Sequence, residues 1–88
     1  MIMYIVLVYD IGEERVARIM KVCRKYLNHI QNSVFEGEIS VANFKKMQIE
    51  LKKHMDLGYD SIIIYRLGNV KFMQRISFGV DKNISNFI

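Results

Sequence analysis

Met3-Tyr4-Ile5-Val6-Leu7-Val8-Tyr9-Asp10-Ile11, near the start of the 88-residue chain, is uncharged over its first seven residues and then carries one carboxylate, at Asp10. A continuous apolar run rich in β-branched and aromatic residues predicts a strand buried on both faces. A charge at the end of such a strand requires a partner, a metal ion or exposure to solvent. Mixed α/β proteins often place functional groups where a central strand turns into a helix. An Asp shortly before Gly12 is also an ordinary turn or cap residue, so the rest of the chain must decide.

The remaining pattern predicts two helices that alternate with strands. Residues 12–27 and about 40–56 each carry apolar residues at helical spacing on one face, and Ser40 stands where a helix cap belongs. Two one-faced helices among four or five strands predict an α+β fold, a ferredoxin-like βαββαβ sandwich with an additional C-terminal edge strand. Extended patterns lie at residues 29–39, 61–65 and 75–80. In the first of them the alternation of apolar and polar residues slips near Asn32-Ser33, which predicts a bulge or bend.

The chain reads as one domain, residues 1–88, without linkers or repeats. A chain this short buries only about 60 to 65% of the surface that it exposes when unfolded, which favours self-association. We expect the apolar tail, residues 81–88, to pack on its own sheet edge or on a partner protomer. The lone Cys23 favours a reducing, cytoplasmic setting and is expected in the core. The opening apolar run is too short for a membrane helix and lacks a basic leader, so we expect no membrane association.

Basic residues are clustered along the predicted helices. Five fall within residues 15–25 and four within residues 45–53, and the net charge is +4. Such clusters attract phosphate backbones through counterion release, but they also form the solvated face of ordinary amphipathic helices. Arg15 and Arg18 lie in the first turns of the first predicted helix, so they should emerge at the same end of the domain as Asp10. This proximity indicates a phosphate site beside a carboxylate.

Most common catalytic signatures are absent from the sequence. It contains no Gly-rich phosphate loop, no HExxH, no paired-cysteine zinc spacing and no nucleophile elbow. His29 and His54 are isolated and are expected to be solvated. Glu36 and Glu38 fit a solvated strand face. Asp10 therefore remains the principal candidate.

A carboxylate such as Asp10 suits Mg²⁺ or Mn²⁺. One carboxylate does not hold a hydrated magnesium ion firmly, but two copies related by a two-fold axis would bring two together. The dimer would then be the catalyst. The metal would lower the pKa of bound water and offset charge on the phosphate, while Arg15 and Arg18 would hold the strand by its backbone.

Four segments, in this order and spacing, resemble the CRISPR-associated protein 2 family, the small subunit of the spacer-acquisition machinery. The resemblance covers the chain from Met3 to about Val80, and each motif alone is weak. The segments are Val8-Tyr9-Asp10-Ile11, Tyr26-Leu27, Ile30-Gln31-Asn32-Ser33-Val34-Phe35-Glu36-Gly37 and Ser61-Ile62-Ile63-Ile64-Tyr65.

The resemblance implies a ferredoxin-like homodimer whose two Asp10 side chains face one another and bind a divalent metal. Family members are described as metal-dependent nucleases acting on single-stranded RNA or double-stranded DNA. They are also described as subunits that bridge two dimers of a larger integrase. The last strand of the family commonly pairs with the partner's sheet, which would account for the apolar tail.

The resemblance also suggests roles for two aromatic residues. It places Tyr9 beside the metal as a second catalytic residue and Phe35 in the kinked strand, where we predict a nucleic-acid contact; both also fit core packing. Some relatives carry a basic residue where this chain has His29, which puts a nucleic-acid contact there in doubt. The residues predicted to bind nucleic acid are Arg15, Arg18, Lys21 and Phe35.

Two alternatives stand beside the nuclease. The chain would act as a purely architectural subunit if it bound duplex DNA through Arg15, Arg18 and Lys21 without needing Asp10. It would be an RNA-recognition domain if Arg75-Ile76-Ser77-Phe78-Gly79-Val80 served as that fold's base-stacking motif. In that fold, however, the aromatic strand precedes the second helix, whereas this segment follows it.

Overall fold

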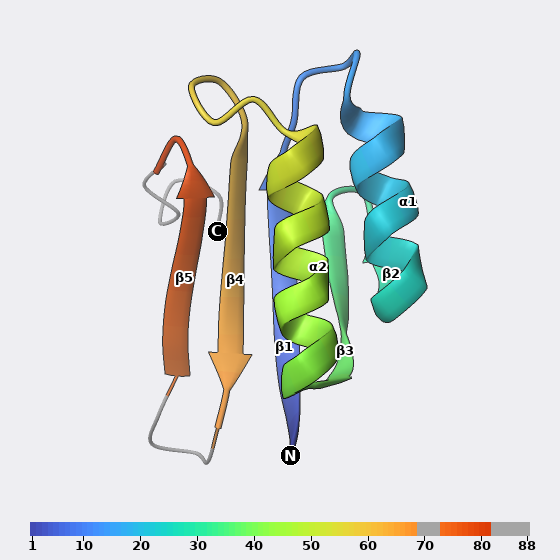
Figure 1. Ribbon diagram of the computed structural model, residues 1–88, viewed down its shortest axis with the longest axis vertical. Coiled ribbons are helices and arrows are strands. Elements are labelled where there is room, and N and C mark those ends of the chain that lie inside the picture. The colour runs from blue at the N-terminus through green and yellow to red at the C-terminus, as the bar shows by residue number, and fades with distance from the viewer. Residues whose placement is uncertain (69–72, 82–88) are drawn as a thin grey trace.

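The fold consists of two helices on one five-stranded sheet. The computed structural model describes residues 1–68 and 73–81. The strands follow the order β2-β3-β1-β4-β5, and each neighbouring pair is antiparallel (Figure 1), as expected for a ferredoxin-like sandwich with an added edge strand. In chain order the elements are β1 (Ile2–Asp10), α1 (Val16–Tyr26), β2 (Asn28–Gln31), β3 (Val34–Ser40), α2 (Val41–His54), β4 (Ser61–Leu67) and β5 (Met73–Gly79).

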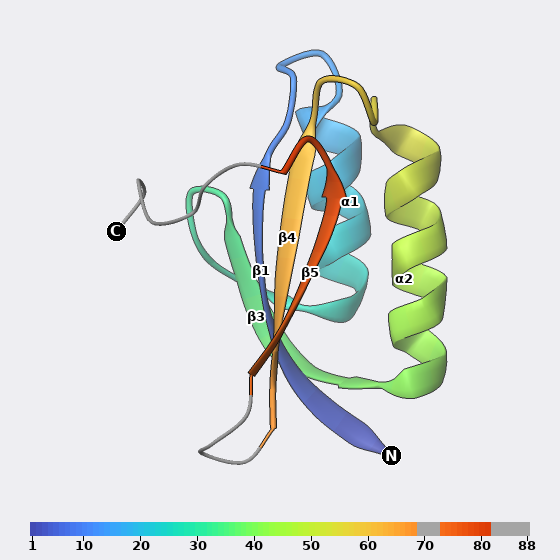
Figure 2. The ribbon, with the colours of Figure 1, turned by 90° about the vertical axis from the view of Figure 1, so that its left-hand side faces the viewer.

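The central strand β1 is buried by the helices on one face only. Both helices lie on the same side of the sheet (Figure 2), and the side chains of β1 alternate between buried and more exposed positions. The prediction of burial on both faces is therefore wrong for the single protomer. Ile2 is 60% and Tyr4 36% exposed on what we call the second face, the sheet face opposite the helices. The buried side chains of β1 are Met3, Ile5, Leu7 and Tyr9.

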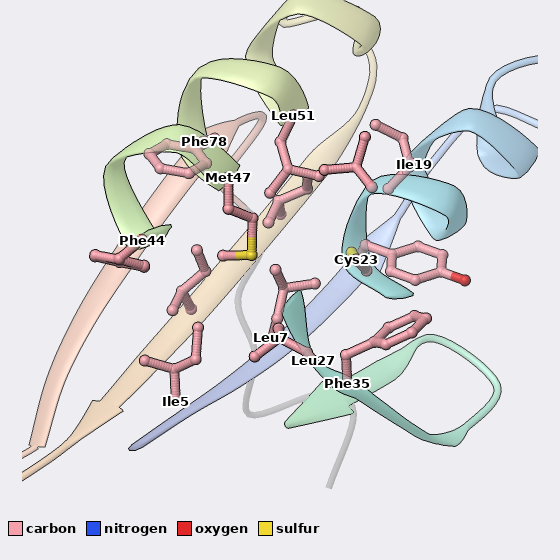
Figure 3. Close-up of a cluster of buried hydrophobic side chains, with 14 of the residues drawn as sticks. Ile5, Leu7, Ile19, Cys23, Leu27, Phe35, Phe44, Met47, Leu51 and Phe78 are labelled. Carbon is pink, nitrogen blue, oxygen red and sulfur yellow. The ribbon is translucent and has the colours of Figure 1, made fainter. Parts of the chain in front are cut away.

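The core lies between the helices and the sheet (Figure 3). Cys23 belongs to it as predicted, and burial raises the pKa of its thiol to about 12. This cysteine therefore packs as a small apolar residue and is not a nucleophile at neutral pH. The helices contribute Ile19, Val22 and Cys23 from α1 and Phe44, Met47 and Leu51 from α2.

The helix boundaries differ from the predicted ones at one end. α2 begins as predicted, because Ser40 Oγ accepts a hydrogen bond from the Asn43 amide at 3.1 Å. α1 begins at Val16 and not at Gly12, since a turn occupies the intervening residues and the Arg15 amide donates to the Gly12 carbonyl. No helix in the described part of the chain is long and apolar enough to cross a membrane.

The slipped alternation after α1 marks a β-hairpin. β2 and β3 are separate short strands whose register shifts between His29 and Gln31. Asn32, at the turn, has a positive φ of 40°, a conformation that Asn tolerates better than most residues. The prediction of a bulge or bend near this point is confirmed. The apolar tail, apart from Asp81, lies outside the described residues.

Candidate active site and nucleic-acid interface

Asp10 is an exposed residue at the end of β1. It pairs in register with Ser61, the first residue of β4, and Ser61 in turn pairs with Gly79, the last residue of β5. Because strand side chains alternate and Tyr9 faces the core, the Asp10 carboxylate lies on the second face of the sheet. The ends of β1 and β5, together with the loop that leads into β4, lie at the same end of the molecule (Figure 1). We call this the Asp10 end.

Tyr9 points away from Asp10. Its side chain is buried on the helix side of the sheet, and its hydroxyl donates to the Asn32 carbonyl at 3.5 Å. Burial raises the pKa of this phenol, so it is protonated at neutral pH. The structure therefore does not bring the Tyr9 and Asp10 side chains together within a protomer. A role for Tyr9 beside a metal stays a prediction.

Phe35 is fully buried in the core. Its ring stacks on the exposed His29 ring with 4.6 Å between centroids and lies 6.1 Å from the Tyr9 ring. His29 Nε2 also lies 2.8 Å from the Asn32 carbonyl oxygen, at the hairpin turn. Phe35 has no ring surface to offer a nucleic acid in the folded protomer, so the predicted contact would have to pass through His29, which covers it.

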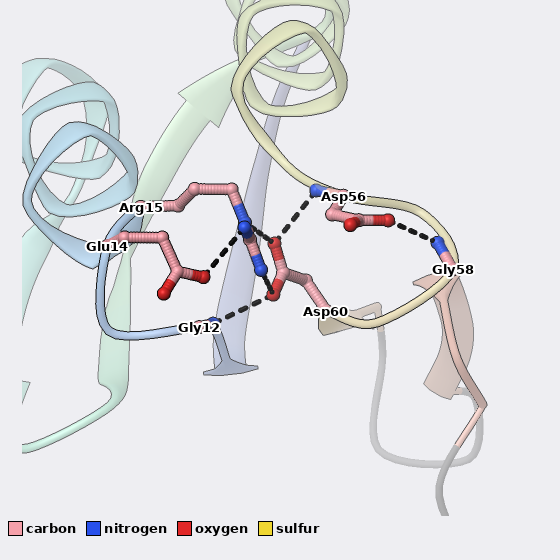
Figure 4. A network of polar contacts seen from close by, with 6 residues as sticks. All are labelled: Gly12, Glu14, Arg15, Asp56, Gly58 and Asp60. Atoms are coloured by element: carbon pink, nitrogen blue, oxygen red, sulfur yellow. Dashed lines mark hydrogen bonds and ion pairs between the residues drawn. The ribbon is translucent and has the colours of Figure 1, made fainter.

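Arg15 lies at the Asp10 end, as predicted, but its guanidinium is bonded within the chain. Nε and Nη2 donate to the Asp60 carboxylate at 2.6 and 2.8 Å (Figure 4), and Nη1 lies 2.8 Å from Glu14 Oε1. Asp60 is fully buried and also accepts from the backbone amides of Gly12 and Asp56 at 2.7 and 2.8 Å. The Arg15 guanidinium holds the pKa of Asp60 far below its usual range, with help from both amides, although burial opposes the shift.

Arg18 and Lys21 line a groove of about 310 Å³ between α1 and α2. Both are exposed, and neither has an ion-pair partner among the described residues. A cationic groove of this kind suits a phosphate group. We call it the helix groove. Its lining consists of Arg18, Lys21, Val22 and Lys25 from α1 and Glu50 and His54 from α2.

One carboxylate offsets part of the positive charge in the helix groove. Glu50 accepts hydrogen bonds from the Lys25 ammonium and from the Tyr26 hydroxyl. Both bonds lower the pKa of Glu50, and the bond from Lys25 has the larger effect. Glu50 therefore joins α2 to α1 while neutralising Lys25. The free cationic charge of the groove comes from Arg18 and Lys21.

Among residues 1–68 and 73–81, the donor set of one protomer is too small for a metal centre. No group of three or more His, Cys, Asp or Glu side chains is placed to hold a metal ion in the part of the chain that the structure describes. Glu36 is the register partner of Val6, four residues before Asp10 on β1, so it lies well away from the Asp10 carboxylate. It accepts a hydrogen bond from the Tyr4 hydroxyl at 2.8 Å. The exposed Asp10 carboxylate fits Mg²⁺ or Mn²⁺ only if a second carboxylate or a substrate phosphate joins it.

Sequence reasoning missed two features of the site. Asp60 directly precedes a buried strand and has the sequence appearance of a turn residue, so nothing in the local pattern indicated a buried ion pair. His54, expected to be isolated, joins the lining of the helix groove.

Phe78, the proposed stacking residue of an RNA-recognition domain, is only 9% exposed, and Lys52 Nζ lies 4.6 Å from its ring centroid. That ring packs in the core and is not available to a base.

The sequence is similar to known proteins over nearly its whole length. The family model described as "CRISPR associated protein Cas2" matches residues 3–75. A protein of Pyrococcus furiosus named CRISPR-associated endoribonuclease Cas2 is 48% identical over 81 residues, which cover 92% of this chain and 93% of that one. A protein of the same name from Thermotoga maritima is 41% identical over 86 residues, covering 98% and 99% of the two chains.

Solved structures show the same fold. One described as the crystal structure of cas2 matches with a TM-score of 0.75 and 39% identity, covering 93% of this chain and 92% of that chain. The crystal structure of Streptococcus pyogenes Cas2 at pH 6.5 matches with a TM-score of 0.70 and 32% identity, covering 77% and 89%. Both likenesses extend over at least three quarters of this chain.

Proposed function

The chain belongs to the CRISPR-associated Cas2 family, as its motifs predicted, and from this premise we propose that it is a metal-dependent endonuclease that works as a homodimer. Relatives are named endoribonucleases, so single-stranded RNA is the first substrate class and double-stranded DNA the second. The observation that carries the proposal is the exposed Asp10 carboxylate at the end of β1. A reducing cytoplasmic setting, consistent with the single buried Cys23, belongs to the same proposal.

The second face of the sheet supports the dimer. Val6 and Val8 are only partly buried there, and Ile2 and Tyr4 are more exposed. A sheet face that carries several apolar side chains is stabilised when a second copy covers it. Asp10 lies on this same face, so a two-fold pairing of second faces would bring one Asp10 from each protomer to the seam.

Two Asp10 carboxylates at such a seam fit Mg²⁺ or Mn²⁺, which usually take one or two carboxylates together with substrate phosphates. When bound, the metal supplies an activated water and offsets negative charge on the phosphodiester. Arg18 and Lys21 would bind the nucleic-acid backbone without reading its sequence. Hydrolysis would break one P–O bond of the phosphodiester and add one water molecule across it.

A second function follows from the helix groove. Arg18 and Lys21 present positive charge from α1, which covers one side of the sheet, whereas the Asp10 carboxylate lies on the second face. This observation favours a DNA-binding bridge that associates with the larger CRISPR-associated integrase subunit during spacer integration. Such an architectural role does not depend on Asp10. If the architectural role is the whole function, the purified protein binds DNA and does not cleave.

The substitution Asp10→Asn separates the two functions. We expect it to lower cleavage of RNA or DNA about 100-fold or more, because even residues that only support metal ligands contribute about 10- to 100-fold. Duplex DNA binding and the sedimentation coefficient of the dimer should remain unchanged. The assay compares Mg²⁺, Mn²⁺ and EDTA over a range of pH.

Glu38→Gln is the matched control. Glu38 is an exposed carboxylate on the same sheet face, near the opposite end of β1, where it pairs with Tyr4. The Glu38→Gln protein should cleave RNA or DNA at the wild-type rate. Undiminished cleavage by rigorously purified Asp10→Asn protein would show that the nuclease assignment is wrong. If the wild-type protein binds DNA but does not cleave, the architectural role is the whole function.

A further inference from the structure

Asp60 joins its own loop to two other segments at the Asp10 end, the β1–α1 connection and the residue after β5. Its carboxylate accepts from Gly12 in the loop after β1, from Arg15 before α1 and from Asp56 in the loop after α2 (Figure 4). Its backbone carbonyl accepts from the amide of Val80, just after β5, at 2.9 Å. Asp60 has no exposed surface, so these bonds are shielded from competing water.

These bonds bracket Asp10 on both sides. Gly12 lies two residues beyond Asp10 in the chain, and Ser61, which follows Asp60, is the register partner of Asp10 on β4. The chain direction after Asp10 is thus held through Gly12, and the neighbouring strand begins at the residue next to Asp60. A shared metal site formed by two protomers requires each carboxylate to be held to within about 0.5 Å.

We propose that Asp60 and Arg15 are a positioning pair that fixes the Asp10 carboxylate for catalysis. This inference rests on the proposed nuclease function. It gives Arg15 a role different from that of Arg18 and Lys21. Arg15 acts through Asp60 on the geometry of the site, whereas the other two bind the phosphate backbone.

The surroundings of Arg15 support this division. Its side chain is only 24% exposed, Glu14 pairs with Nη1, and the Tyr59 ring lies 5.7 Å from its guanidinium carbon. Its donors are therefore largely committed within the chain, whereas Arg18 and Lys21 lie exposed in the helix groove. Nε, Nη1 and Nη2 of Arg15 each already bond a carboxylate, so a phosphate there would compete with two acids for the same guanidinium.

Gly12 leaves the space that this pair needs. A Cβ at Gly12 would lie 2.3 Å from Arg15 Nη2 and 2.6 Å from Glu14 Oε1, so a side chain there requires the guanidinium to shift from the position in which it bonds Asp60. The substitution Gly12→Ala therefore disturbs the pair while keeping both of its charges. It provides a second variant that does not leave a buried charge unpaired.

The test compares Asp60→Asn and Gly12→Ala with wild type in RNA cleavage and in amide hydrogen exchange. For both variants we expect kcat to fall about 10- to 100-fold, with KM within about twofold of wild type. Exchange of the amides from Ile11 to Arg15 should accelerate, while the dimer persists by sedimentation. Arg15→Lys should lower kcat in the same way although it keeps the positive charge, because an ammonium lacks the bidentate fork of a guanidinium.

Asp81→Asn is the control. Asp81 also pairs with an arginine, Arg75, at 2.7 Å, but Asp81 is exposed. The Asp81→Asn substitution should therefore leave kcat and the hydrogen exchange of residues 11–15 unchanged. A raised KM with unchanged kcat in the Arg15 and Asp60 variants would overturn the proposal and place Arg15 on the nucleic acid. Unchanged loop exchange would also overturn it. Wild-type protein that never cleaves refutes the proposed function instead, and the exchange data then report whether Asp60 holds the loop.

Discussion

Asp60 and Glu50 each use one carboxylate to join segments that are distant in the chain, yet their surroundings differ. Asp60 is completely buried and accepts from one guanidinium and two backbone amides. The Glu50 side chain is 30% exposed and accepts from Lys25 and Tyr26 across the two helices. The Asp60 carboxylate has its bonding capacity filled within the protein, whereas the Glu50 carboxylate is partly open to solvent.

This difference separates two properties that a nucleic-acid enzyme needs. A buried ion pair is costly to form but, once satisfied, fixes the geometry of the segments it joins. A surface ion pair contributes little to stability and is screened by salt, so its charges remain exchangeable with those of a ligand. We therefore assign rigidity to the Asp10 end and adjustable charge to the helix groove.

The largest expected effect that tests this comparison is on stability. Asp60→Ala leaves the Arg15 charge and two backbone amides without their acceptor, and breaking a buried pair in this way costs about 3 to 5 kcal/mol. Glu50→Ala exposes its former partners to water and should shift Tm by a few degrees at most. Urea and thermal unfolding at one fixed protein concentration, which removes mass-action effects, measure both. Equal losses for the two variants would mean that burial does not distinguish the two carboxylates.

Local sequence patterns predicted most of the fold. The uncharged run of β1, the Ser40 cap and the slip at Asn32-Ser33 are all local signals, and the structure shows the corresponding strand, helix start and hairpin. The position of Asp10 at a strand end followed from the same reasoning. Such features depend on neighbours within a few residues, which is why sequence suffices for them.

Features that depend on distant partners were not predictable. Asp60 lies 45 residues after Arg15, and no spacing rule tells which acid meets which base once the chain folds. From its sequence position alone, Arg15 is predicted to bind nucleic acid. Which face of β1 is buried likewise depends on where the helices pack. The opposite directions of Tyr9 and Asp10, by contrast, follow from the alternation of side chains along a strand.

A smaller effect is expected on acid stability. The pKa of Asp60 is far below its usual range in the folded state, so its contribution is complete above the unfolded-state pKa of about 3.9 and declines as the pH falls below that value. The stability difference between wild type and Asp60→Asn should therefore be constant from about pH 5 to 7 and shrink below pH 4. The matched difference for Glu50→Gln has the same sign but is weaker, because the group is exposed. Chemical denaturation at several pH values gives both curves. A difference that grows as the pH falls would contradict the ion pair.

The smallest expected effect is on the salt dependence of nucleic-acid binding, and it sharpens the comparison most. Each protein cation that neutralises a phosphate contributes about 0.9 to the slope of log affinity against log salt concentration. Arg18→Ala should therefore lower the magnitude of this slope by about 0.9, and Glu50→Gln should raise it by up to about 0.9, since Lys25 is released from its partner. Arg15→Gln should leave the slope unchanged, because Asp60 and Glu14 already occupy its donors. Titrations of a fluorescent duplex at several salt concentrations measure all three slopes. If Arg15→Gln reduces the slope as much as Arg18→Ala does, Arg15 neutralises a phosphate, and the division between a rigid end and an adjustable groove is wrong.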